Sequence, residues 1–204
     1  TYFGEKIGGF RNPMSTEDPE EATMVTRLLN SIRTLTASLR PRRIRPIVPP
    51  VTVTDANDRE VQIRQYSESD RNSLVTMYDD FDPTQRAQGV PPRSVEAIRE
   101  WLSDALDGIH VVAAVNNKIV GHIGFVPDGT GRHELMIFVH PDYQQAGIGS
   151  DLIAAGLGHA EQAGVTYVWL SVEKRKRYQQ QFYNRAGFSL VNSSGMTYRM
   201  SRLL

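Results

Sequence analysis

Residues 134–164 read ELMIFVHPDYQQAGIGSDLIAAGLGHAEQAG, and this segment is the most informative about the fold. It joins an apolar strand that ends at Val139 to a helix that opens on Gly147 and Gly149. The first turn of a helix leaves backbone N–H groups without partners and carries partial positive charge, while glycine lets a ligand approach the backbone closely. A pyrophosphate is therefore the expected guest of this helix start.

Two common nucleotide-binding loops do not fit this spacing. A Walker loop places Lys and then Ser or Thr after its last glycine, whereas Ser150 and Asp151 follow here. A dinucleotide fingerprint needs a third glycine three positions after the second, and this chain has Leu152 there. Two glycines at a helix start are also compatible with plain turn chemistry, so the loop alone assigns no ligand.

The wider segment resembles the GNAT acetyltransferase superfamily. Its loop is similar to the Q/R-x-x-G-x-G/A acyl-CoA loop, whose backbone amides hold the pyrophosphate of coenzyme A, and consists of Gln144, Gln145, Ala146, Gly147, Ile148 and Gly149. Residues 139–143 (VHPDY) and 182–188 (FYNRAGF) resemble the motifs before and after that loop. The resemblance covers about residues 60–204. It implies an α/β GNAT fold, a mixed central β-sheet with a splayed central strand pair and flanking helices.

Three positions depart from the family pattern, and they affect contacts with coenzyme A rather than the fold. The chain has Lys176 where an Asn is common, Gln179 where an Ala is common, and Gln144 where an Arg is commoner. Within the superfamily, the chain loosely resembles the Pat-type protein-lysine acetyltransferases. That group places a Glu five residues before the Val of the coenzyme A strand, as Glu134 precedes Val139 here.

The resemblance implies acetyl-CoA as cosubstrate and direct attack by an amine in a ternary complex. Glu134 is the candidate base, acting through water, and Tyr183 is the candidate acid at the sulfur of coenzyme A. Strand alternation puts Glu134 on one face with Met136 and Phe138, unless the bulge that is usual in this family interrupts the strand. The implied cofactor-binding residues are Ile137, Phe138, Val139, the six loop residues 144–149, and Lys176.

Each of these side chains also has a plainer interpretation. Glu134 also fits an exposed or ion-paired strand carboxylate, and Tyr183 also fits a core residue. The basic run 174–177 either meets phosphates or is a solvated helix start. The acidic run 79–82 is either a rim for a cationic amine or a polar turn. The five histidines show no metal-ligand spacing and are expected to be structural or surface residues, with His140 as an alternative base.

The chain divides into an N-terminal extension, residues 1–50, and an acetyltransferase domain, residues 51–204. The extension consists of a loose tail, an amphipathic helix over about 17–39 and a basic Pro-rich linker, which is a solvated connector or a docking site for an acidic partner. The helix carries a narrow apolar seam of Val25, Leu28, Ile32, Leu35 and Leu39. We expect this seam to be buried against its own domain or, preferably, in a homodimer.

The composition of the chain excludes several kinds of site and partner. The 204 residues contain no cysteine, which excludes disulfides, thiolate zinc sites and a cysteine nucleophile. The 23 basic and 23 acidic residues balance, so nucleic acid is not expected as a partner. No apolar run approaches the roughly 18 residues of a membrane span and no secretory signal is visible, so a cytoplasmic protein is expected.

The acceptor cannot be read from the sequence, so several functions stay open at this stage. A protein lysine and a small-molecule amine are the two acceptors that we consider. Two alternatives to an enzyme use the same fold. One is an acyl-CoA-binding sensor, and the other is an interaction protein that uses the domain as a scaffold.

Overall fold

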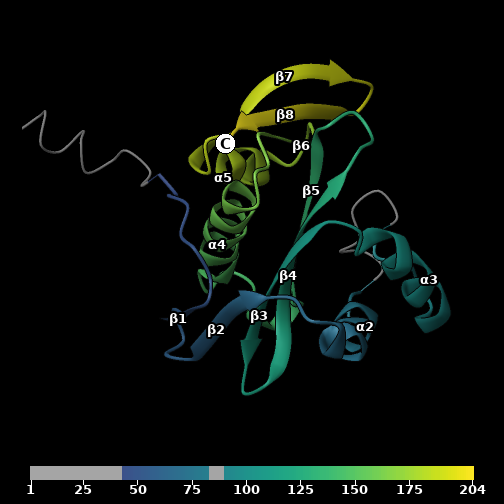
Figure 1. Ribbon diagram of the computed structural model, residues 1–204, viewed down its shortest axis with the longest axis vertical. Helices are drawn as coiled ribbons and strands as arrows, with labels where there is room; N and C mark the ends of the chain where they lie inside the picture. Colours follow the sequence, from purple (N-terminus) through teal and green to yellow (C-terminus); the bar gives the residue numbers. More distant parts are fainter. Residues whose placement is uncertain (1–42, 83–89) are drawn as a thin grey trace, which may run out of the picture. The chain divides into compact units, whose positions relative to one another are not determined.

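The computed structural model describes residues 43–82 and 90–204, which belong to one compact unit from Arg42 to Leu204 (Figure 1). The helix predicted over 17–39 lies outside the described residues. None of the described helices is long and apolar enough to cross a membrane.

The central sheet has eight strands in the order β1-β2-β3-β4-β5-β6-β8-β7. Neighbouring strands are antiparallel except β5 and β6, which run parallel, so the mixed sheet predicted from the sequence is confirmed. The strands are β1 (Val51–Thr54), β2 (Glu60–Gln65), β3 (Ile109–Val115), β4 (Lys118–Pro127), β5 (His133–Val139), β6 (Tyr167–Glu173), β7 (Ser189–Ser194) and β8 (Thr197–Leu203).

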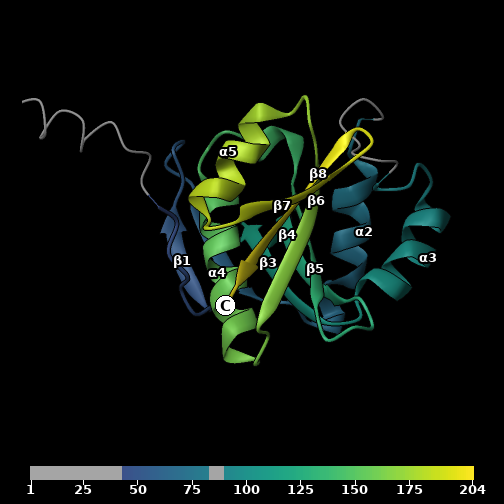
Figure 2. The same ribbon diagram turned by 90° about the horizontal axis from the view of Figure 1, so that it is seen from above.

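Helices cover both faces of this sheet (Figure 2). The helix α4 packs across β2 to β5 on one face, and α2 packs on β4 on the other, with α3 against α2. The helices are α2 (Arg71–Asp79), α3 (Val95–Ala105), α4 (Ile148–Gln162) and α5 (Arg177–Arg185), with 3-10 turns at η1 (Glu68–Asp70) and η3 (Pro141–Tyr143). Local signals explain their ends: Ser94 Oγ accepts a hydrogen bond from Ala97 N–H at 3.2 Å, and Gly164 follows α4 with φ +85°.

The central strands separate because β6 leaves β5. The two strands pair only at His133 with Val168 and at Glu134 with Trp169, whereas β6 pairs with β8 along all seven of its residues. The bulge that is usual in the family does not interrupt the strand 133–139, because β5 keeps an uninterrupted register against β4. Register shifts lie instead between Ala113 and Ala114 of β3 and between Leu190 and Asn192 of β7. The long pairing of β6 with β8 therefore directs β6 away from β5.

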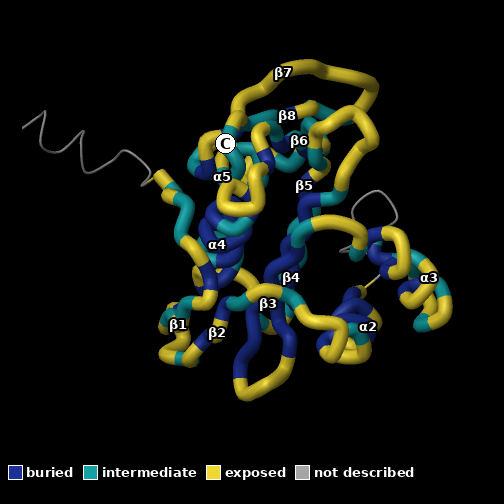
Figure 3. The backbone as a smooth tube through the Cα atoms, in the orientation of Figure 1, coloured by how far each residue is buried: buried dark blue, intermediate teal, exposed yellow. Residues whose placement is uncertain are grey.

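Two apolar cores lie on the two faces of the sheet. Ile137 and Val139 pack against the core that contains the inner side of α4, while Phe138 packs against the core formed with α2 and α3. This confirms the predicted alternation along β5. Figure 3 shows that α4 and the central strands are the buried part of this unit, whereas β7 at the sheet edge is exposed.

A buried polar chain connects α2 to the sheet. Tyr78 Oη lies 2.6 Å from His122 Nδ1, and His122 Nε2 lies 3.1 Å from His110 Nδ1. Tyr78 and His122 are fully buried, and His110 is 5% exposed. The three groups form one hydrogen-bonded chain, in which the tautomers of the two imidazoles set the donors and acceptors. Burial lowers the pKa of both histidines, so both are neutral near pH 7.

Residues 43–50, here called the strap, differ from the solvated connector expected of the Pro-rich linker. Ile44 N–H donates to Arg185 O at 2.9 Å, and Ile47 N–H donates to Ala154 O at 3.0 Å. Both isoleucines pack against the core on the α4 face. The strap therefore belongs to the packed unit, because its two isoleucines supply apolar contacts between its arginines and prolines. The domain boundary at Val51 stays a prediction.

Candidate active site

A cavity of about 440 Å³ lies at the split between β5 and β6. Tyr183 lines this cavity on the side of the sheet that carries α4 and α5. Trp101 and Ala105 line it on the side that carries α3. The split therefore connects the two faces of the sheet at one point. The remaining lining residues are Val90, Asp104, Val126, Glu134, Leu135, Met136, Ile137, Phe138, Ser171, Val172, Glu173, Lys176 and Gln179.

The loop 144–149 presents unpaired backbone amides at the start of α4. The N–H groups of residues 145–149 make no backbone hydrogen bond with the described residues. Gly147 is the N-cap of α4 with φ +97°, and a Cβ there would meet no atom within 4 Å, so the space in front of the loop is open. Ala146 and Ile148 are buried, which anchors the loop from behind. These features fit an anionic group such as a diphosphate.

Beside the cavity, β5 exposes a backbone edge that β6 does not cover. His140 N–H donates to Val120 O of β4, and alternate residues of a strand point to the same neighbour. The backbone groups of Ile137 and Val139 therefore point toward the side that β6 has left. Gln144 Nε2 donates a hydrogen bond to the Val139 carbonyl oxygen at 3.0 Å. The backbone N–H and C=O of Ile137 are therefore left to bind an amide-bearing chain in the split.

Glu134 lines the cavity at the point where β5 and β6 diverge. Partial burial raises the pKa of its carboxyl; Arg199 opposes this shift and Asp128 adds to it. No described residue forms a hydrogen bond or an ion pair with this carboxylate. It is therefore placed to accept a proton at a higher pH than an ordinary glutamate.

Tyr183 lines the same cavity from α5. Its ring packs edge-on against Phe182 and Phe188, with centroids 5.2 and 6.0 Å apart. Burial raises the pKa of its phenol to about 12, so the hydroxyl keeps its proton at neutral pH. No described residue accepts a hydrogen bond from it. The structure thus brings Glu134 and Tyr183 to one cavity, and their roles stay predictions.

Two further residues of α5 face the cavity at helical spacing from Tyr183. Lys176 lies at the N-cap of α5, and its Nζ pairs with Glu173 Oε1 at 3.2 Å. Gln179 has a buried side-chain oxygen without a hydrogen-bond partner. An orphaned buried acceptor beside the unpaired edge of β5 suits the amide N–H groups of a pantetheine arm.

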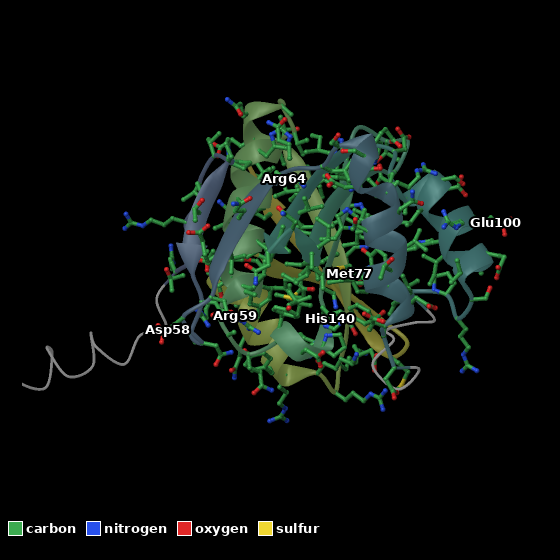
Figure 4. The ribbon with its side chains drawn as sticks, turned by 90° about the horizontal axis from the view of Figure 1, so that it is seen from below. Asp58, Arg59, Arg64, Met77, Glu100 and His140 are labelled. Carbon is green, nitrogen blue, oxygen red and sulfur yellow. The ribbon has the colours of Figure 1, made fainter. Side chains whose placement is uncertain are left out.

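His140, the alternative base, is engaged elsewhere. Its Nδ1 accepts from Asp142 N–H at 3.2 Å, and its Nε2 lies 3.1 Å from Asp80 Oδ2. The imidazole is 4% exposed and does not line the cavity. His140 and Met77 are buried, whereas Glu100 is exposed and lies on the outer side of α3 in Figure 4. His140 therefore closes the end of β5 rather than facing an acceptor.

The acidic residues near the cavity are not the ones singled out in the sequence. Asp79, Asp80 and Asp82 do not line it, and Asp80 pairs with Lys118 as well as His140. The lining carboxylates are those of Glu134, Glu173 and Asp104 of α3. Asp104 lies one helical turn after Trp101, on the same side of α3. In the sequence, only the apolar pattern of this helix could have indicated that Asp104 faces the cavity. No group of three or more potential metal ligands occurs in residues 43–82 and 90–204.

Comparison with known proteins gives the family. The sequence pattern of the acetyltransferase (GNAT) family matches residues 74–188, more than half of the chain. This chain belongs to the GNAT acetyltransferase family. Membership of this family and the GNAT fold expected from the sequence are both confirmed.

One relative and two solved structures support this assignment. A mycothiol acetyltransferase from Propionibacterium freudenreichii subsp. shermanii is 30% identical over 115 residues, which are 54% of this chain and 36% of that protein. The match thus spans about a third of the relative's length.

The GNAT domain of S. lividans PAT superposes with a TM-score of 0.65 at 16% identity, covering 76% of this chain and 96% of that one. The PaiA N-acetyltransferase from Thermoplasma acidophilum, solved in complex with coenzyme A, gives 0.56 at 17% identity, covering 71% and 99%. At these identities the two structures support the fold.

Proposed function

We propose that this chain transfers an acetyl group from acetyl-CoA to an amine by direct attack in a ternary complex. The observation that carries the proposal is the single cavity at the β5–β6 split, which joins the loop side of the sheet to the α3 side. A cosubstrate that enters from one face and an acceptor that enters from the other would meet there. This arrangement supplies the proximity that acyl transfer needs.

On the cosubstrate side, three features would hold acetyl-CoA. The amides of residues 145–149 bind its diphosphate, and the edge of β5 at Ile137, with Gln179 opposite, binds its pantetheine amides. A backbone N–H of β5 also stabilises the negative charge that develops on the thioester oxygen. Gly147 leaves the room that this approach requires.

The chemistry requires a cationic amine to lose two protons and the sulfur to gain one. Glu134 accepts the first amine proton through a water molecule, which frees the nitrogen lone pair for attack on the thioester carbon. The new N–C bond forms as the C–S bond breaks, and the nitrogen then releases its second proton, which replaces the one that reaches the sulfur. Tyr183 donates a hydrogen bond or its proton to the departing thiolate, which its protonated phenol can do at neutral pH.

The acceptor side suits a cationic amine on a partly apolar carrier. Trp101 and Phe138 form apolar walls with their rings 6.3 Å apart, and Asp104 and Glu134 supply negative charge. The likeness to a protein named mycothiol acetyltransferase makes a small-molecule amine the first acceptor to test, and a protein lysine is the second.

An acceptor screen tests this proposal. Purified protein is incubated with acetyl-CoA and small amines, peptides or proteins, while free thiol release and acetylated product are measured together. We expect stoichiometric thiol and acetyl-amine with at least one acceptor. Binding of acetyl-CoA without turnover of any acceptor would instead favour the acyl-CoA sensor.

A further inference from the structure

The strap presents two arginines beside the start of α4. Arg43 and Arg45 are exposed on either side of Ile44, which packs inward. Neither guanidinium forms an ion pair with residues 43–82 or 90–204. These two cations are therefore available to an anionic ligand.

Both arginines line a cavity of about 610 Å³ together with Arg185 at the end of α5. The other side of this cavity is the first turn of α4, where Ser150 and Asp151 directly follow the loop 144–149. Asp151 is the only carboxylate in the lining, and it pairs with neither Arg43 nor Arg45. The cavity thus collects three positive charges next to the proposed diphosphate site.

The position of the strap is held by its backbone rather than by the arginines. Ile44 and Ile47 hydrogen-bond to α5 and α4, and a Cβ at Gly158 would overlap the Ile47 carbonyl oxygen. Gly158 therefore allows the strap to lie directly on α4. The arginines are presented from a fixed segment, which reduces the entropy that binding a ligand costs.

Acetyl-CoA carries a third phosphate, a monoester on the ribose 3′ oxygen of the adenosine that carries the diphosphate. A diphosphate on the amides of residues 145–149 would leave this monoester within one ribose of the first turn of α4. Three other basic residues are already paired: Lys176 and Arg175 with Glu173, and Arg59 with Asp55. Arginine suits a phosphate monoester because its planar fork donates two parallel hydrogen bonds.

We propose that Arg43 and Arg45, with Arg185, bind the ribose 3′-phosphate of coenzyme A. The inference rests on the proposed function and extends it to a segment outside residues 74–188, to which the family pattern is confined. The strap then makes the enzyme discriminate coenzyme A from its 3′-dephospho form.

Calorimetry with two ligands tests this directly. Coenzyme A and 3′-dephospho-coenzyme A are titrated into the full-length wild type and the double variant Arg43→Ala/Arg45→Ala. We expect the wild type to prefer coenzyme A by about tenfold to 100-fold, the scale of one or two charge-assisted hydrogen bonds. The double variant should lose that preference while its affinity for the dephospho ligand is unchanged, which also shows that it is folded.

The control Arg93→Ala removes one exposed arginine that does not line the cavity, and it should keep the wild-type preference. A double variant that keeps the wild-type ratio, or a wild type that binds both ligands equally, overturns the proposal and leaves the acetyltransferase function standing. A wild type that binds neither ligand overturns the proposed function itself.

Discussion

Glu134 lies at an exposed position of β5, and the cavity partly desolvates its carboxyl group. If it is the base, Glu134→Gln should lower kcat/KM by about 100-fold to 10,000-fold at neutral pH and leave acetyl-CoA binding intact. The defect should shrink as pH rises, because more acceptor amine arrives neutral. In the wild type, kcat/KM should fall as pH drops through the raised pKa of Glu134, above the range of an ordinary glutamate.

The measurement is a kcat/KM profile from about pH 6 to 10. Glu100→Gln is the matched control, since Glu100 is exposed on the outer side of α3. Full activity of Glu134→Gln at neutral pH would remove this carboxylate from the mechanism.

Replacing Tyr183 should change the kinetics in a different way from replacing Glu134. Tyr183→Phe removes the donor to the departing sulfur, so kcat should fall by about tenfold to 1,000-fold, and high pH should not rescue it because the amine proton is not involved. Tyr178→Phe on the same helix, 74% exposed, is the control and should behave as wild type. A Tyr183→Phe defect that disappeared at high pH would show that the phenol does not assist the leaving group.

At the scale of elements, the loop before α4 is expected to bind through its backbone. Gly147→Glu should abolish measurable acetyl-CoA binding in calorimetry, because the side chain fills the open space and repels the diphosphate. Gly164→Glu is the matched control. That glycine also has a positive φ and open surroundings, so both variants carry similar strain, but it follows the far end of α4. Equal affinities in the two variants would contradict the loop assignment.

The buried pair His110–His122 should make the unit acid-sensitive. Burial lowers the pKa of His110 from an ordinary 6.5 to about 4, so the unfolded chain binds more protons than the folded one between these values. The free energy of unfolding should therefore fall as pH drops from about 6.5 to about 4, by about 3 kcal/mol for His110 alone.

Urea unfolding across this pH range measures the loss. Replacing His122 with Gln should reduce the slope, because the contribution of His122 is lost while that of His110 remains. The control His159→Gln changes a partly exposed histidine of α4 and should leave most of the slope in place. An unchanged slope in His122→Gln would show that the buried pair does not govern acid stability.

Several elements could be predicted because their signals are local. The strand 133–139 and the Ser94 cap are confirmed, and the turn at Asn116 and Asn117 shows the positive φ values that such a hairpin requires. The sequence left open whether a bulge interrupts the strand 133–139, since register depends on the partner strand. The His110–His122 contact was also missed as a pair, because twelve positions along two strands give no signal of side-chain orientation.

For the whole molecule, the family and fold follow from one continuous stretch, but the site requires distant segments to meet. Glu134 and Tyr183 could be named from their motifs, while Asp104 could not, because its role depends on how α3 packs. The path of β6 depends on its pairing with β8, which comes later in the chain. The packing of the strap could not be predicted from its composition. Its prolines and arginines indicate a solvated connector, and they outnumber the two isoleucines that pack against the core.

The contact between the strap and α4 gives a prediction about the stability of the whole unit. Gly158→Ala places a Cβ against the Ile47 carbonyl oxygen, which should cost about 1–3 kcal/mol of overpacking against a gain of about 1 kcal/mol in helix propensity. Gly149→Ala is the matched control in the same helix. Its Cβ would lie 3.8 Å from the nearest atom, Val139 Cγ2, so the propensity gain should stand alone.

Urea unfolding of both variants should therefore give opposite signs, with Gly158→Ala less stable and Gly149→Ala as stable as wild type or more so. Because displacing the strap also moves Arg43 and Arg45, Gly158→Ala should lose part of the preference for coenzyme A over its 3′-dephospho form. A Gly158→Ala variant that gained stability and kept this preference would show that the strap does not rest on α4 in solution.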